Sequence, residues 1–303
     1  MTQPRATDVE VAPGTSTLVH PGPAAPERVI CLPTRLTGHD VELPAGTPLL
    51  EALEQLLDRT GCVSANGQLI GGELREYSYY VPALGPKGGP VATFSEPHPG
   101  TAPGRMIRGG ITVGRRDGAV FCHSHSLFSD AEGVERAGHL IPEMVVLGEG
   151  VRAQVWGGPD VLVEVRPDPE TRMPLFTPVR VADTARGEAA AVVCRVRPNV
   201  DLTRTIEWLT AGQGWRGADV RGQVGSLVGG RLRQPDGTIV TVDGPATEVM
   251  FLDGTVREVD GRMAAKLHAH LVDRHAAVHS GELVPGENAV ALTYELVLTE
   301  AVS

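Results

Sequence analysis

The sequence predicts two copies of one unit that combines a single amphipathic helix with β-strands. Three observations support this prediction. Each half of the chain has a strand followed by a helix, then a glycine-rich turn with β-like sequence, and later a strand that carries His-x-His, at 123–125 and at 268–270. Because the same elements recur in the same order, an internal duplication is the simplest explanation.

The composition is that of an ordinary folded protein. The 303 residues suggest two domains, and hydrophobic residues at 41% with charged residues at 21% exclude a disordered, collagen-like or disulfide-stapled chain. Aromatic residues make up only 4%, so we expect cores of Val, Leu, Ile and Ala. The 27 basic and 37 acidic residues give a net charge of −10, which argues against a generally basic, nucleic-acid-binding surface.

Four segments are expected along the chain. Residues 1–27 are rich in Pro, Thr, Ala and Gly and lack periodicity, which predicts a flexible arm. A first domain is expected at 28–157 and a second at 188–300. The stretch 158–187 between them contains five prolines, which predicts a linker.

Each domain has one helix with clear end signals. At 46–61, Thr47 is the expected N-cap and Gly61 the expected stop, and leucines recur on one face at the helical period. In the second domain, Asp201 is the expected N-cap of a helix that runs to Gly212 and also has an apolar face.

Histidines in the first domain predict a metal site. Strand alternation places His123 and His125 on one face, and two imidazoles there can bind one ion. His139 follows 14 residues later, which allows a turn and a return strand that brings it beside the pair. A lone His-x-His is more often a surface feature, but the third histidine and the recurrence of the pair favour a site. Three imidazoles suit Zn²⁺ with an open fourth position.

The second domain carries a related set. It keeps His268 and His270, and an alignment of the return segments puts Glu282 at the position of the third histidine, 12 residues after His270. Two imidazoles and a carboxylate suit Zn²⁺, Fe²⁺ or Mn²⁺. The shorter hairpin leaves open the alternative that this copy has lost the site and that Glu282 is an ordinary solvated carboxylate.

These motifs resemble the PPC (plant and prokaryote conserved) domain, also called DUF296. The resemblance rests on His-x-His followed by Gly138-His-Leu140, on the run from Gly244 to Gly254, and on the closing strand 293–298. It implies an α+β fold in each copy, a mostly antiparallel sheet with a packed helix, and assembly into trimers. It also implies a bound metal, with zinc the expected ion, at the three motif histidines of the first copy.

The function predicted from these features is that of a metal-dependent lyase or hydrolase acting on a small carboxylate. Arginines gather before the metal strand, at 105, 108, 115 and 116, and an arginine fork binds a carboxylate through two hydrogen bonds. The predicted substrate contacts are Arg105, Arg108, Arg115 and Lys266, and the predicted proton-transfer groups are Glu143 and Glu282.

Two other functions stay open. Plant members of the resembled family are associated with DNA through a separate Arg-Gly-Arg-Pro motif, which this sequence lacks. A protein that binds a metal or a metabolite without catalysis is the other alternative. The four cysteines are far apart in sequence, and we find neither a secretory signal nor an apolar run of membrane length, so a cytoplasmic protein with reduced thiols is expected.

Overall fold

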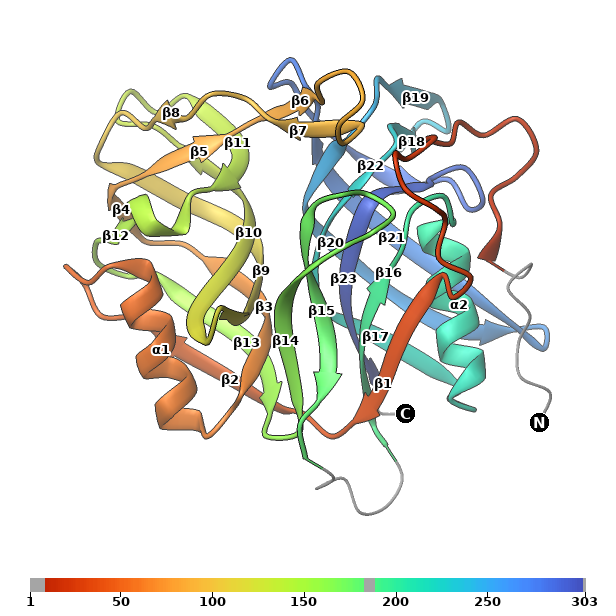
Figure 1. The fold of residues 1–303 in the computed structure, drawn as a ribbon, viewed down its shortest axis with the longest axis horizontal. Helices are drawn as coiled ribbons and strands as arrows, with labels where there is room; N and C mark the ends of the chain where they lie inside the picture. Colours follow the sequence, from red (N-terminus) through yellow and green to blue (C-terminus); the bar gives the residue numbers. More distant parts are fainter. Residues whose placement is uncertain (1–8, 183–188, 302–303) are drawn as a thin grey trace.

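The computed structural model describes residues 9–182 and 189–301. Two sheets pack face to face, and one helix covers the outer face of each, so that the layers run helix, sheet, sheet, helix (Figure 1). The predicted α+β class, with two tandem and mostly antiparallel units, is confirmed. In the described part of the chain, no helix is long and apolar enough to cross a bilayer.

The first unit has one helix, α1 (Leu49–Thr60), and a sheet whose main path is β2-β13-β3-β9-β10-β11-β5-β8. Its strands are β2 (Thr37–Glu42), β3 (Ser64–Ile70), β4 (Glu73–Glu76), β5 (Ser78–Tyr80), β6 (Pro82–Leu84), β7 (Ala92–Phe94), β8 (His98–Pro99), β9 (Gly104–Arg116), β10 (Ala119–Ser129), β11 (Glu135–Leu140), β12 (Val146–Leu147) and β13 (Arg152–Gly158). The short β4 pairs with β9 and β12, and β6 and β7 form a separate two-stranded ribbon.

The second unit has one helix, α2 (Leu202–Gly212), and the strand order β1-β16-β23-β17-β20-β21-β22-β18-β19. Its strands are β1 (Val29–Thr34), β16 (Ala191–Val196), β17 (Gly217–Leu227), β18 (Gly230–Arg233), β19 (Ile239–Val242), β20 (Thr247–Val259), β21 (Arg262–Val272), β22 (Val278–Leu283) and β23 (Val290–Glu300). The path β16-β23-β17-β20-β21-β22 repeats the path β2-β13-β3-β9-β10-β11 strand for strand. The duplication that the sequence predicts is therefore present in the strand order.

The two helices begin in different ways. Asp201 is the N-cap of α2, and its Oδ1 accepts a hydrogen bond of 2.8 Å from the Arg204 amide, as expected. In α1 the N-cap is Pro48, one residue after the predicted Thr47, and no side chain caps the helix. The amide of Leu49, which has no partner within the helix, donates instead to the Val145 carbonyl at 2.9 Å. A neighbouring segment therefore satisfies a helix N-terminal amide that a cap side chain would otherwise satisfy.

This difference predicts unequal effects of two alanine substitutions. Asp201→Ala should lower the free energy of unfolding by about 1–2 kcal/mol, because Asp201 also accepts a hydrogen bond from the Asn288 amide. Thr47→Ala should change it by less than about 0.5 kcal/mol. Urea denaturation of both variants checks the prediction, and equal losses would contradict it.

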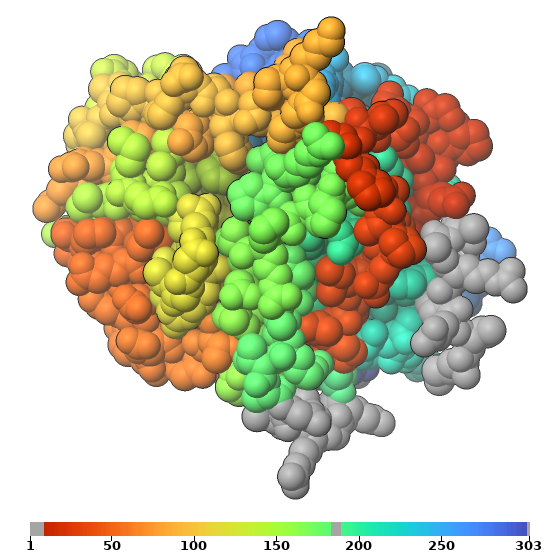
Figure 2. All heavy atoms as spheres, viewed as in Figure 1, coloured from red at the N-terminus to blue at the C-terminus, as the bar shows by residue number. Residues whose placement is uncertain are grey.

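The predicted linker contains a β-hairpin instead. Strands β14 (Val161–Pro167) and β15 (Pro174–Arg180) pair throughout, and β14 also meets β9 at one parallel bridge. Val161, Val163 and Phe176 are buried in a cluster with residues of β16 and β23. The nearby prolines do not prevent strand formation here, because the alternating apolar side chains of β14 are buried between the two sheets. Figure 2 shows this hairpin, in green, on the surface between the units. Positions 183–188 of the predicted linker lie outside the described residues.

The N-terminal arm is also not free where the structure describes it. Residues 9–27 lie along the second unit, where Val9 is buried and the Leu18 amide donates to Asn199 Oδ1 at 2.8 Å. The next strand, β1, pairs with β16 rather than with the first sheet, although the sequence places it in the first domain. Residues 1–8 of the predicted arm lie outside the described residues.

Close approach of the two sheets is possible because small residues meet there. A Cβ atom on Gly110 would lie 2.2 Å from the Gln223 carbonyl oxygen, and one on Gly222 would lie 2.6 Å from the Asn66 Cβ. Any side chain at either position would push the sheets apart. This close packing brings the histidine-bearing face of the first sheet against the second unit.

Candidate metal centre

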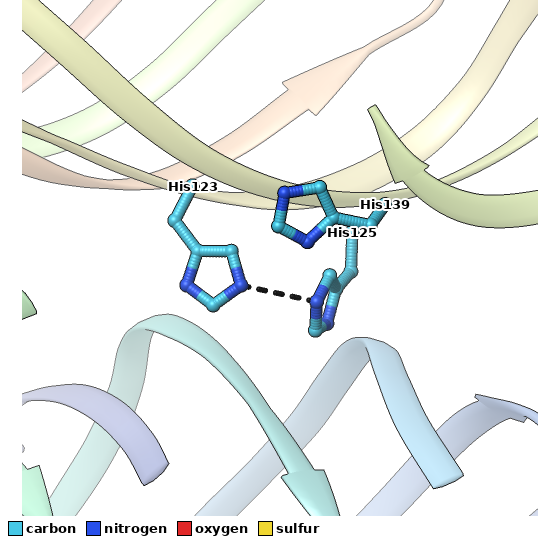
Figure 3. Close-up of side chains that lie close together, drawn as sticks. All are labelled: His123, His125 and His139. Atoms are coloured by element: carbon cyan, nitrogen blue, oxygen red, sulfur yellow. Dashed lines mark hydrogen bonds between the residues drawn. The ribbon is translucent and has the colours of Figure 1, made fainter. Parts of the chain in front are cut away.

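Two neighbouring strands place the three histidines of the first unit together. His123 and His125 point to one face of β10, and His139 on β11 lies directly opposite His125 in the antiparallel ladder. The predicted turn and return strand are thus what brings the third ring beside the pair. Figure 3 shows the three rings gathered on the side of the sheet that faces the second unit.

The ring nitrogens are close enough to share one ion. Among the residues that the structure describes, these histidines form the one group of three potential ligands whose atoms all lie within 4.8 Å of one another. The Nε2 atoms of His123 and His125 are 3.1 Å apart. Two imidazole nitrogens bound tetrahedrally to one zinc ion are roughly 3.3 Å apart, so the observed spacing fits such a pair.

The second unit orients two of these ligands. His123 Nδ1 is 2.8 Å from the Glu295 carboxylate on β23, and His125 Nδ1 is 3.2 Å from the Val249 carbonyl oxygen on β20. When Nδ1 donates to such acceptors, the lone pair is on Nε2 and faces the shared position, as in carboxylate–histidine–metal arrangements. His139 Nδ1 is buried and has no hydrogen-bond partner among the described residues.

Burial sets the charges at this site. It lowers the pKa of His125 and of His139 well below the usual value, and a positive charge on the neighbouring His123 would lower both further. Both imidazoles are therefore neutral at neutral pH, which metal ligation requires. Burial also raises the pKa of Glu248 to about 8; its carboxylate lies 3.6 Å from His125 Nε2. The residues present thus fit a divalent cation.

The histidines line a cavity of about 320 Å³ between the units. Its walls come from the β6–β7 ribbon, the β9–β10 hairpin, the β14–β15 hairpin and the second sheet. The lining residues include Tyr80, Thr93, Phe94, Arg116, Phe121, Glu143, Val165, Leu175, Phe176, Ser226, Glu248, Leu292 and Glu295. A ligand in this cavity would touch the histidines directly.

The predicted ligands of the second unit are arranged differently. His270 stacks on Phe251, with ring centroids 4.1 Å apart, and His268 is exposed. Glu282 lies opposite His268, and Ser280 lies opposite His270. By strand pairing, Ser280 therefore holds the position of His139, two residues from the alignment that the sequence suggests. The structure does not gather His268, His270 and Glu282 into a three-ligand group.

None of the four predicted substrate contacts lines this cavity. Arg105 is exposed on β9 opposite Ser129, and Lys266 is exposed on β21. Arg108 forms an ion pair with Asp253, and the Arg115 guanidinium donates to the Gly118 carbonyl at 3.2 Å.

The two predicted proton-transfer groups also separate. Glu143 lines the cavity, at its rim, whereas Glu282 is on the other sheet, away from it. Of these two groups, only Glu143 is therefore placed to transfer a proton in the cavity.

Two such carboxyl groups, both from the second unit, were missed. Glu248 and Glu295 are buried at 4% and 3% exposure, and each has one oxygen without a partner in the described structure. The signal was an acidic residue inside an otherwise apolar strand, as in Thr293-Tyr-Glu-Leu-Val-Leu298. A buried carboxylate is costly unless it is paired, so such a residue marks a site.

Part of the chain matches a known protein family. The family described as the Plants and Prokaryotes Conserved (PCC) domain matches residues 184–302. No curated protein matches the chain.

Several solved structures are similar to about half of the chain. A metal-containing protein from Archaeoglobus fulgidus is 20% identical, with 49% of this chain and 98% of that chain covered at a TM-score of 0.40. A plant- and prokaryote-conserved protein from Pyrococcus horikoshii is 18% identical, with 50% and 97% covered at 0.36. A protein from Ralstonia eutropha JMP134, named as a candidate DNA-binding protein, is 21% identical, with 46% and 89% covered at 0.37.

The family match agrees with the resemblance noted in the sequence. The PCC match covers the second unit, and the first unit repeats the strand path of the second. The second unit is thus similar to the Plants and Prokaryotes Conserved domain family, and the strand order of the first unit makes it a structural repeat of the second.

Proposed function

We propose that the chain binds one divalent transition-metal ion, Zn²⁺ by ligand type, and presents it to a small molecule in the cavity between its two units. The observation that carries this proposal is the convergence of His123, His125 and His139 on the wall of a cavity of about 320 Å³. Three protein ligands would leave a fourth zinc position open, and all three histidines line the cavity.

Catalysis is the further step in this proposal. A zinc ion at this place would polarise an oxygen of the bound molecule or lower the pKa of a bound water. The second unit supplies Glu248, whose carboxyl group lines the same cavity and lies 3.6 Å from His125 Nε2, as a group able to hold or move a proton. Lyase or hydrolase chemistry on a small carboxylate stays the prediction for this step, and metabolite binding without chemistry is the simpler function of the same site.

DNA binding is a second candidate function. It is favoured by the match of residues 184–302 to the Plants and Prokaryotes Conserved domain family and by the name of the similar Ralstonia eutropha protein. The net charge of −10 weighs against it, because contacts to phosphates supply most of the non-specific affinity for DNA.

Metal titration tests the proposed function. The chain, stripped with a chelator, should take up one Zn²⁺ per molecule in isothermal titration calorimetry. Glu282→Ala, which removes the carboxylate predicted for the second copy, should leave this stoichiometry at one, because Glu282 is not beside the three histidines.

Two results would contradict the proposal. A chain that takes up no metal would leave His123 and His125 as a simple hydrogen-bonded pair. A sequence-preferring shift of duplex DNA at physiological salt, unaffected by zinc, would instead favour the second candidate.

A further inference from the structure

We propose that the molecule bound in the cavity is a carboxylic acid with an apolar body, and that Arg116 at the rim binds its carboxylate while its other end reaches the three histidines. This inference rests on the proposed function and names the class of its ligand. It also replaces Arg105, Arg108 and Arg115 as the arginines that contact the ligand.

Arg116 has free donors that face the cavity. Its guanidinium lies over the Phe121 ring, with the Cζ atom 3.3 Å from the ring centroid, and it lines the cavity. The neighbouring carboxylate, Glu143, is 3.6 Å away and 51% exposed, which is beyond a good hydrogen bond and makes a weak pair. Among the described residues no side chain or carbonyl accepts a hydrogen bond from Arg116. Its planar fork can therefore bind a carboxylate through two hydrogen bonds.

The walls between this arginine and the histidines are apolar. Phe121 and Phe176 stack with centroids 6.2 Å apart, and Phe94 packs on His139 at 4.6 Å. Leu175 and Leu292 complete this part of the lining. Such walls favour a ligand whose middle is hydrocarbon, since a polar group there would lose its hydrogen bonds to water.

The strand sets the distance between the two ends of the ligand. Phe121, His123 and His125 are alternate residues on one face of β10, and Arg116 reaches back over the first of them. Phe121 and His123 are two residues apart, which is about 6.7 Å along a strand. Because the Arg116 guanidinium lies over Phe121, it is roughly this far from His123 along the strand axis. A short dicarboxylic acid such as adipate has a comparable span and can place one carboxylate at each end.

Arg115 provides a matched control. It is the next residue on β9, so its side chain leaves the opposite face of the strand, where it donates to the Gly118 carbonyl. A substitution of Arg115 removes the same charge from the same strand without touching the cavity.

The experiment measures binding of adipate and of hexanoate by calorimetry. Each acid is titrated into the zinc-loaded and the chelator-stripped chain, for the wild type, Arg116→Gln and Arg115→Gln. Arg116→Gln should weaken both acids about ten- to a hundred-fold, which corresponds to the loss of charge-assisted hydrogen bonds. Arg115→Gln should bind as the wild type does. Adipate, but not hexanoate, should bind more tightly when zinc is present, because only adipate has a second carboxylate for the metal.

The outcomes separate this inference from the function on which it rests. If zinc binds but Arg116→Gln leaves both affinities unchanged, or if the wild type binds neither acid, the inference is overturned while the metal site stands. If no zinc binds, the proposed function fails, but hexanoate still tests the inference: a weaker affinity in Arg116→Gln supports it, and an unchanged affinity overturns it. Thermal unfolding of both variants checks that the chain is folded, which the exposed position of Arg116 favours.

Discussion

His125→Ala is expected to reduce the zinc affinity of the chain by at least about a thousand-fold, because loss of a residue that merely orients a ligand already costs about ten- to a hundred-fold. His125 is the central ligand: it is buried, lies 3.1 Å from His123 through its Nε2 atom, and faces His139 across the ladder. Competition of the stripped chain with a chromophoric chelator measures the affinity.

His268→Ala is the control for this substitution. It removes the histidine that occupies the position of His123 in the second unit, is exposed, and should leave the affinity unchanged. Glu295→Gln gives an intermediate case, since it weakens the hydrogen bond that orients His123 and should lower the affinity about ten- to a hundred-fold. Equal affinity in all three variants would show that the histidines do not form the zinc site.

Asp168→Ala is expected to lower the free energy of unfolding by about 3–5 kcal/mol, because it leaves a buried arginine without its counter-charge. Asp168 is in the turn of the β14–β15 hairpin, and its carboxylate accepts from Arg195 at 2.7 Å and from Arg197 at 3.0 Å. Arg195 is on the second sheet and 2% exposed. The ion pair therefore links the β14–β15 hairpin to the second unit. This hairpin forms one wall of the cavity.

Asp236→Ala is a close control for Asp168→Ala. Asp236 accepts from the amide and hydroxyl of Thr238, as Asp168 does from Thr171, but it is exposed and pairs with no arginine among the described residues. Urea denaturation should show a loss below about 1 kcal/mol for this variant. A similar loss in both would mean that the turn, and not the buried charge pair, is responsible.

The same carboxyl group predicts a loss of stability in acid. Burial would raise the pKa of Asp168, but hydrogen bonds from Thr171 and the charge of Arg195 outweigh burial and lower the pKa from 3.8 to about 2. A group whose pKa is lower in the folded state stabilises that state above its unfolded pKa and stops doing so as the pH falls through the folded pKa. The difference in free energy of unfolding between the wild type and Asp168→Ala should therefore shrink between about pH 4 and pH 2. A constant difference would contradict this assignment.

Much of the candidate site follows from local pattern. Strand alternation and a hairpin of suitable length suffice to bring His123, His125 and His139 to one face, because both depend on residues close in sequence. The arginine that lines the cavity could not be chosen in the same way. Arg115 and Arg116 are adjacent, and only the position of the cavity relative to β9 distinguishes them.

The second copy shows the limit of alignment by motif. The similar segments Ser280-Gly-Glu-Leu283 and Ala137-Gly-His-Leu140 suggest that Glu282 matches His139. The hairpin of the second unit is shorter, however, and pairs His270 with Ser280. A two-residue change of register keeps every side chain on its face but changes its neighbour across the ladder.

By itself the sequence determined the duplication, the two helices, the α+β class and the histidine face, since each depends on periodicity or on short-range spacing. Only the tertiary structure decided what covers that face. Glu248 and Glu295 are more than 100 residues away in sequence from the histidines that they contact. Likewise, no local sequence pattern shows that β1 pairs with β16 or that the β14–β15 hairpin packs on β16 and β23. The packing of one sheet on the other sets these contacts, because it depends on the shape and burial of both faces together.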